Sequence, residues 1–192
     1  KRLLRDPEAI VVAFDNLSTG SAKNIESVMV DSETRGRFAF YNGDITEMES
    51  LLDLLTTMRR QFGRDFNFDV VANLACPASP LKYQELAVET LMAGSIGIKN
   101  LIDFARMNDE AYLFHTSTSE VYGDPQVHPQ PESYFGNVNP VGPRSMYDES
   151  KRFSEALLMA SKYPKFGIVR IFNTYGPHMD LDDGRMVQTF IK

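Results

Sequence analysis

Residues 114–124 read FHTSTSEVYGD, and residues 147–151 read YDESK. The first segment predicts the end of a strand that carries hydroxyls and a carboxylate into a site. The second places the phenol of Tyr147 four residues before the ammonium of Lys151. On a helix this spacing puts both side chains on one face, one turn apart. Because a neighbouring ammonium favours the phenolate, we predict that the pKa of Tyr147 falls towards neutrality.

A tyrosine tuned in this way indicates proton transfer. It can take a proton from a sugar or alcohol hydroxyl while a cofactor takes the hydride. The pair alone is a weak sign, because the same spacing occurs by chance on many solvated helix faces. The motifs around it therefore decide the interpretation.

The composition is that of an ordinary globular chain. Its 192 residues, 43% hydrophobic and 24% charged, suffice for one domain with a core. The net charge of -6 argues against a nucleic-acid-binding surface. The single cysteine, Cys76, excludes an internal disulfide and favours an intracellular, cytoplasmic setting. We expect no metal site, since the three histidines share no ligand spacing with Cys76, and no membrane segment, since no apolar run is long enough.

Short apolar runs alternate with segments of helical periodicity. Residues 68–75 are almost continuously apolar, which suggests a parallel strand covered on both faces. A long helix is expected over 85–107, with Gly94 and Gly97 marking close packing against another element. Further strands are expected at residues 10–14, 37–41, 111–114 and 166–172. This order predicts an α/β fold with a doubly wound parallel sheet.

A helix is also expected after residue 46, and the sequence predicts where it starts. Thr46 and Glu49 have the spacing of a capping box, in which the two side chains satisfy backbone N–H groups reciprocally. We therefore expect the helix to follow Thr46, which would be its N-cap.

Taken together, these motifs resemble the extended short-chain dehydrogenase/reductase family of nucleotide-sugar enzymes. Residues 74–80 (LACPASP) and 129–140 (PQPESYFGNVNP) are similar to its UDP-glucuronate decarboxylase branch. The resemblance covers nearly all of the chain. It departs from the family at residues 93–95 (AGS), where a Thr-Asn-Val or Thr-Ser-Val type of sequence is expected.

The resemblance implies NAD as the bound cofactor. Asp15 follows the strand at 10–14, where dinucleotide-binding folds place the acid that holds the adenosine ribose and repels the extra phosphate of NADP. An aspartate that merely ends a strand is the alternative. The implied cofactor contacts are Asp15, Asn16, Ser18, Thr19, Gly20, Asp44, Ile45, Leu74, Ala75, Ala78, Tyr147 and Lys151.

The fold is expected to be incomplete. No Gly-x-x-Gly-x-x-Gly loop precedes the first strand, whereas the family places that loop and its own strand ahead of the turn at residues 1–5. We expect residues 1–176 to form part of an NAD-binding, Rossmann-like domain. Residues 177–192 would begin the substrate-binding region, most of which lies outside this sequence.

The resemblance also implies the reaction, which is decarboxylation of UDP-glucuronate to UDP-xylose through a 4-keto intermediate. Tyr147 would be the base, and Lys151 would hold it ionised. Thr118 would hydrogen-bond to the C4 oxygen of the sugar. Ser119 and Glu120 would steer the decarboxylation and reprotonation steps.

Three residues are implied contacts of the nucleotide sugar, which is the expected partner. They are Tyr83, Asn173 and Arg185. A guanidinium fits a diphosphate bidentately, which supports Arg185 in this role. Tyr83 can equally be a packed aromatic residue. The family also implies a homodimer formed through helices near Tyr147.

Three other functions stay open. A 4,6-dehydratase usually carries Asp-Glu where this chain has Ser119-Glu120, and a hydroxyl is a poor acid for expelling water. A 4-epimerase is possible, although the segments at 76–80 and 134–137 argue against it. A non-catalytic nucleotide-sugar-binding protein could use the same fold. The intact set of Thr118, Tyr147 and Lys151 speaks against that last reading.

Overall fold

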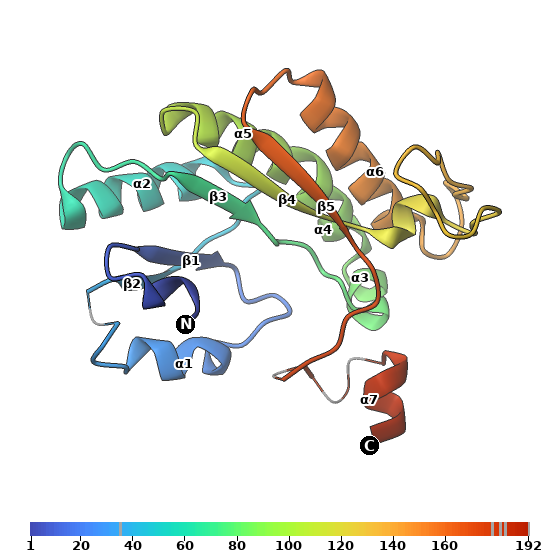
Figure 1. Ribbon diagram of the computed structural model, residues 1–192, viewed down its shortest axis with the longest axis horizontal. Helices are drawn as coiled ribbons and strands as arrows, with labels where there is room; N and C mark the ends of the chain where they lie inside the picture. The colour runs from blue at the N-terminus through green and yellow to red at the C-terminus, as the bar shows by residue number, and fades with distance from the viewer. Residues whose placement is uncertain (35, 178, 181, 183, 192) are drawn as a thin grey trace.

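The computed structural model describes residues 1–34, 36–177, 179–180, 182 and 184–191. Helices and strands alternate along the chain, as predicted (Figure 1). The elements are η1 (Leu3–Arg5), β1 (Val11–Asp15), α1 (Lys23–Met29), β2 (Phe38–Asn42), α2 (Met48–Phe62), β3 (Val70–Asn73), α3 (Pro80–Glu85), α4 (Ala87–Met92), η2 (Ala93–Gly97), α5 (Ile98–Met107), β4 (Tyr112–Thr118), η3 (Ser119–Tyr122), α6 (Ser145–Ala160), β5 (Phe166–Ile171) and α7 (Met186–Ile191).

The named strands pair in parallel, but they form two sheets instead of one. β1 pairs with β2, and β4 lies between β3 and β5. A cavity of about 410 Å³ separates the sheets, lined by side chains of both β1 and β3. The parallel sheet is thus interrupted between these two strands. The predicted fold class, a Rossmann-like α/β fold, is confirmed.

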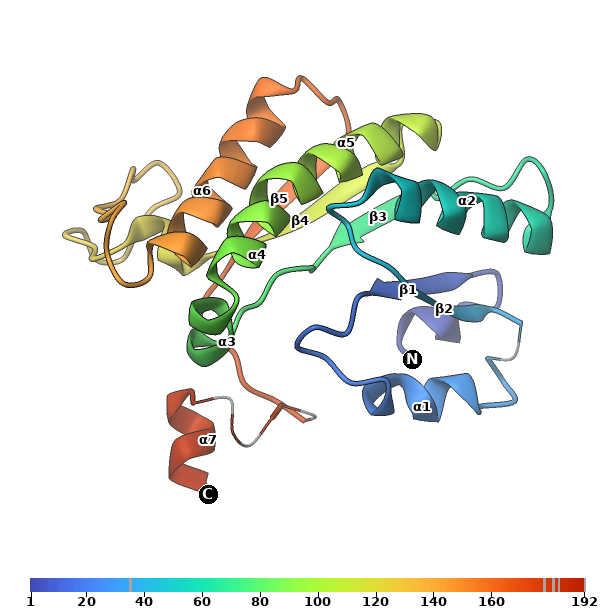
Figure 2. The ribbon, with the colours of Figure 1, turned by 180° about the vertical axis from the view of Figure 1, so that it is seen from behind.

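Helices α4, α5 and α6 cover one face of the three-stranded sheet, as the view from behind shows (Figure 2). Apolar residues of α2 and α5 pack with β4 and α6 to form the core. Its fully buried members include Leu51, Ile98, Leu113 and Leu158. This core fixes α6 against the sheet, which matters because α6 carries Tyr147 and Lys151. Among the described residues, no helix combines the length and apolar character needed to cross a bilayer.

The long helix expected over 85–107 forms as a continuous run from Ala87 to Met107, made of α4, the π-helical turn η2 and α5. Leu86 (φ -112°, ψ 50°) separates this run from α3. The predicted close packing at the glycines is confirmed. A Cβ added at Gly94 would lie 2.6 Å from the carbonyl oxygen of Ser150, and one at Gly97 would lie 2.6 Å from Ile45 Cδ1.

Two local predictions are wrong. The strand at 68–75 is shorter, and Val70 is 55% exposed, because β3 borders the open cavity on one side. The capping box is absent, and α2 begins at Met48 without a side-chain cap. Instead, the backbone N–H and the hydroxyl of Thr46 both donate to Asp44 Oδ1, at 2.8 and 2.7 Å. The carboxylate of Asp44 therefore orders this loop.

Candidate active site

Three parallel strands deliver their following loops to one edge of the sheet. Asn73 at the end of β3 pairs with His115, and Thr118 at the end of β4 pairs with Ile171 of β5. The loops after these strands therefore meet at the carboxyl edge. This is where open parallel sheets bind ligands.

A cavity of about 380 Å³ lies at this edge. It is lined by every residue that the sequence predicted as catalytic or substrate-binding, namely Thr118, Ser119, Glu120, Tyr147, Lys151, Tyr83, Asn173 and Arg185, and also by Ala78. These residues come from five separate segments of the chain. Their positions agree with a common site, while their individual roles stay predictions.

Tyr147 and Lys151 share the buried face of α6, with exposed fractions of 8% and 5%. The Lys151 ammonium lies 6.0 Å from the centroid of the Tyr147 ring. It donates to the carbonyl oxygen of Thr116 at 2.9 Å. One hydrogen bond to β4 therefore anchors the charged end of this pair.

The predicted fall in the pKa of Tyr147 is wrong for this structure. Burial raises the pKa of Tyr147, and the nearby Thr118 hydroxyl lowers it only in part. Burial likewise lowers the pKa of Lys151. Removal from water disfavours the charged form of each group, and for the phenol this outweighs any help from the lysine. The chain by itself therefore favours a neutral phenol.

Tyr83 is both a packed aromatic residue and a residue of the cavity wall. It is buried and stacks on Tyr147, with ring centroids 4.9 Å apart and planes 12° apart, and it also lines the cavity. Stacking restricts the Tyr147 ring to one orientation. A packed aromatic residue thus also shapes the site.

Arg144 is a site-lining residue that the sequence reasoning missed. It forms an ion pair with Glu120, and its Nη2 lies 3.9 Å from Asp148 Oδ1. Burial raises the pKa of Asp148, while the charge of Arg144 acts in the opposite direction. The available signal was its spacing, since Arg144 precedes Tyr147 by three residues and so falls one helical turn away.

A second cavity, of about 490 Å³, adjoins the first, because Leu74 and Cys76 line both. The predicted cofactor residues along its wall are Asp15, Asn16, Ser18, Thr19, Gly20, Asp44, Ile45, Leu74 and Ala75. Asn16 donates to Asp44 Oδ2 at 2.8 Å, which joins the loops after β1 and β2. An acid at the end of β1 that lines a cavity of this size fits the adenosine half of a dinucleotide.

The position of Cys76 differs from what its sequence context predicts. The apolar run before Pro77 predicts a small core residue, but Cys76 is partly exposed at the junction of the two cavities. Burial raises the pKa of its thiol, so the reactive thiolate is disfavoured. It therefore contributes to the wall of the site as a neutral group.

Comparison with known proteins agrees with this geometry. The family model described as GDP-mannose 4,6 dehydratase matches residues 1–191. The chain belongs to this family. It is 43% identical to UDP-glucuronic acid decarboxylase 3 from Arabidopsis thaliana, over 99% of this chain and 51% of the relative. The chain thus spans about half the length of the curated relatives it matches.

Two solved structures illustrate the similarity in fold. A UDP-glucose 4-epimerase from Thermotoga maritima, solved with UDP-glucose, superposes with a TM-score of 0.76 at 23% identity, over 97% of this chain and 55% of that one. The UDP-glucose 4-epimerase from Brucella ovis in complex with NAD gives a TM-score of 0.65 at 26% identity, over 94% of this chain and 49% of that one. The first of these likenesses establishes the fold alone.

Proposed function

We propose that the protein containing this chain converts UDP-glucuronate into UDP-xylose by an NAD-dependent route through a 4-keto sugar. The observation that carries this proposal is the convergence of Thr118, Tyr147 and Lys151 in one cavity, directly beside a second cavity lined by Asp15. The likeness to UDP-glucuronic acid decarboxylases over nearly the whole chain supports the choice of substrate.

The residues of the first cavity suit oxidation of a sugar hydroxyl at C4. Bound NAD would supply the hydride acceptor and later the hydride donor. Thr118 and Tyr147 would bracket the position for the C4 oxygen, and the Tyr147 phenolate would take the proton of the C4 hydroxyl as the ketone forms. Because burial in the chain alone favours the neutral phenol, we propose that Tyr147 becomes ionised in the substrate complex. The phenol formed by the proton transfer then returns this proton to the C4 oxygen in the final reduction.

The carboxylate at C5 then leaves. A C4 ketone is β to that carboxylate carbon, so loss of CO₂ moves the electron pair of the broken bond into an enolate across C4 and C5. Protonation at C5 restores the ketone, and reduction at C4 yields the pentose. We propose that Glu120, held by Arg144, lies beside C5 with Ser119 and takes part in the protonation.

The same residues argue against two related reactions. A dehydratase needs an acid to expel the C6 hydroxyl as water, and the Ser119 hydroxyl is poorly suited to that task. A 4-epimerase needs no group to guide CO₂ loss or to reprotonate C5. The experiment below separates all three.

We also propose that the whole protein is a cytoplasmic homodimer. Exposed apolar side chains on α6, Phe153 and Met159, support a partner surface on the helix that carries Tyr147. The single cysteine supports a reducing compartment. Light scattering after size-exclusion chromatography would test the dimer, and a monomer at micromolar concentration would contradict it.

The decisive experiment uses the full-length protein, UDP-glucuronate and catalytic NAD. Release of CO₂ and formation of a UDP-pentose, followed by mass spectrometry, are expected. Tyr147→Phe should abolish both, whereas the control Tyr112→Phe, at the opposite end of β4 from Thr118, should leave them unchanged.

Other products would overturn the proposal in distinct ways. An isomer of equal mass would indicate an epimerase, and loss of water would indicate a dehydratase. Tight binding of the nucleotide sugar without any product would indicate a non-catalytic binding protein.

A further inference from the structure

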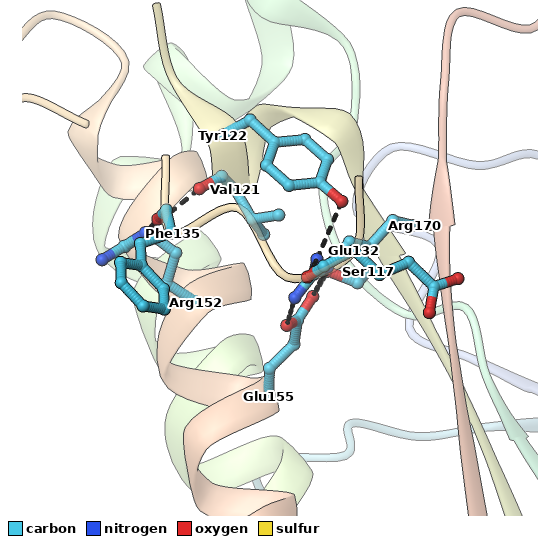
Figure 3. Close-up of polar contacts among 8 residues, drawn as sticks. All are labelled: Ser117, Val121, Tyr122, Glu132, Phe135, Arg152, Glu155 and Arg170. Carbon is cyan, nitrogen blue, oxygen red and sulfur yellow. Dashed lines mark hydrogen bonds and ion pairs between the residues drawn. The ribbon is translucent and has the colours of Figure 1, made fainter. Parts of the chain in front are cut away.

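Behind the cavity, one carboxylate and one guanidinium join five segments of the chain (Figure 3). Arg170 of β5 contacts Glu155 of α6 bidentately, through Nε at 3.0 Å and Nη2 at 2.7 Å. Glu155 also accepts from Ser117 Oγ at 2.6 Å. The Nη1 group of Arg170 donates to Tyr122 Oη at 2.8 Å and to the carbonyl oxygen of Glu132 at 3.0 Å. We call these five residues the Glu155–Arg170 cluster.

Three members of the cluster lie on the elements that carry residues of the candidate site. Ser117 immediately precedes Thr118 on β4 and pairs across the sheet with Arg170. Glu155 follows Lys151 by four residues on α6, so it extends the same helix face by one turn. Tyr122 ends the η3 turn that carries Ser119 and Glu120. The cluster thus touches every element that carries a predicted catalytic group.

A second arginine reinforces one side of this arrangement. Arg152 of α6 donates to the carbonyl oxygens of Val121 and Phe135, at 3.1 and 3.0 Å (Figure 3). It therefore ties the η3 turn and the following loop to the same helix. These two arginines together hold residues 119–136 against α6 and β5.

The environment of the cluster makes its contacts persistent. The side chains of Glu155 and Arg170 are 15% and 26% exposed, and Tyr122 is buried beneath the guanidinium, 5.0 Å from Arg170 Cζ. Burial acts against ionisation of Glu155, but the hydrogen bonds from Arg170 and Ser117 outweigh it and hold its pKa below the usual value. Paired, partly buried charges with fixed fork geometry lose little to solvent competition.

We propose that Glu155 and Arg170 are positioning residues, which set the distance between the Thr118–Glu120 turn and the Tyr147–Lys151 face of α6. This inference rests on the proposed function. The reacting groups come from β4, η3 and α6, and the cluster is where these elements are cross-linked by hydrogen bonds. Catalysis between groups on separate elements is sensitive to ångström-scale displacement.

The test substitutes Arg170→Lys in the full-length protein. Lysine keeps the charge but lacks the fork, so it cannot hold Glu155 bidentately and reach Tyr122 as well. We expect kcat for UDP-glucuronate to fall on the order of 10- to 100-fold, with KM changed by less than about threefold. Glu155→Gln, which keeps the shape but removes the charge, should show the same split between kcat and KM.

Arg59→Lys is the matched control. Arg59 is also a partly buried arginine that ties a loop, donating to the carbonyl oxygen of Phe66 and to Asn67 Oδ1, but it lies outside both cavities. It should lower the melting temperature without changing kcat. If Arg170→Lys behaves like this control, the cluster is merely a stabilising pair and the proposal is overturned.

Hydrogen exchange supplies a readout that does not depend on turnover. Amides of residues 119–136 should exchange faster in Arg170→Lys than in wild type, while those of α2 stay protected. Unchanged exchange at 119–136 would overturn the positioning role whatever the activity. If the wild-type protein leaves UDP-glucuronate unchanged, the proposed function fails, and the exchange result still decides whether the cluster holds this turn.

Discussion

Gly94→Ala should separate α4 and η2 from the helix that carries Tyr147 and Lys151. The added Cβ would lie 2.6 Å from both the carbonyl oxygen and the Cβ of Ser150, and 2.9 Å from its carbonyl carbon. Two of these three atoms are backbone, so no rotamer change can relieve the contact. The helices must move apart, and Lys151 is the next residue along α6.

The cost can be worked from the contacts. Overpacking of this kind costs about 1–3 kcal/mol. Separation also weakens the buried bond from Ser154 Oγ to the Gly94 carbonyl, 2.7 Å in this structure, which is worth about 0.5–1.5 kcal/mol. Alanine returns about 1 kcal/mol through its higher helix propensity. We expect a net loss of about 1–3 kcal/mol in the free energy of unfolding.

Gly97→Ala is the matched comparison, because it adds the same methyl group in the same turn. Its Cβ would meet Ile45 Cδ1 at 2.6 Å and Cγ1 at 2.9 Å, which are atoms of one flexible side chain. Shifting that side chain off its rotamer costs about 0.5–1.5 kcal/mol. The propensity gain of about 1 kcal/mol nearly cancels it. We expect Gly97→Ala to be close to neutral.

The assay is urea unfolding of the two variants and wild type in the full-length protein, with turnover measured in parallel. A difference of about 2 kcal/mol between the variants should appear as a clear shift in midpoint at constant m. Turnover should fall in Gly94→Ala only. Equal midpoints for the two variants, or a less stable Gly97→Ala, would refute the reasoning from backbone against side-chain contact.

Two further predictions follow from individual side chains. Asp15→Asn should weaken NAD binding by roughly 10- to 100-fold, since a hydrogen bond to a charged group is worth about 1.5–3 kcal/mol. The same change should reduce the preference of the protein for NAD over NADP. Calorimetric titration with both cofactors checks this, and unchanged affinities would contradict the ribose-binding role. His115 is buried, which lowers its pKa to about 4, so the unfolded chain binds this proton first. The contribution of His115 to the free energy of unfolding is therefore fully present above pH about 6.5. It is lost as the pH falls towards 4, and the total loss is on the order of 3 kcal/mol. His115→Gln should flatten this part of a stability–pH profile, and an unaltered slope would show that His115 is not the group responsible.

Much of the fold could be read from local patterns. Short apolar runs separated by segments of helical periodicity predicted parallel strands. Each expected strand forms within a few residues of its predicted bounds. The exceptions have physical causes. The expected long helix contains a π turn at 93–97 and is preceded by the separate helix α3, and apolar periodicity alone reports neither feature. The Thr46–Glu49 capping box does not form, because the backbone N–H and the hydroxyl of Thr46 both donate to Asp44 Oδ1 instead.

The candidate site divides in the same way. The spacing of Tyr147 and Lys151 and the acid at Asp15 were visible in the sequence, because they depend on helix period and on strand ends. Arg144 and its pairing with Glu120 were not, since 24 positions separate the two residues and a long loop decides their approach. The same holds for the Glu155–Arg170 cluster, whose members come from five segments.

The sequence by itself determined the order of strands and helices, the family, and which chemical groups reach one edge of the sheet. Only the tertiary structure decided their electrostatic state. An adjacent lysine argued for an acidic Tyr147, yet burial among Tyr83, Cys76 and the strand ends raises its pKa. Spacing along a helix is a local property, whereas desolvation is set by everything that distant segments pack around the group.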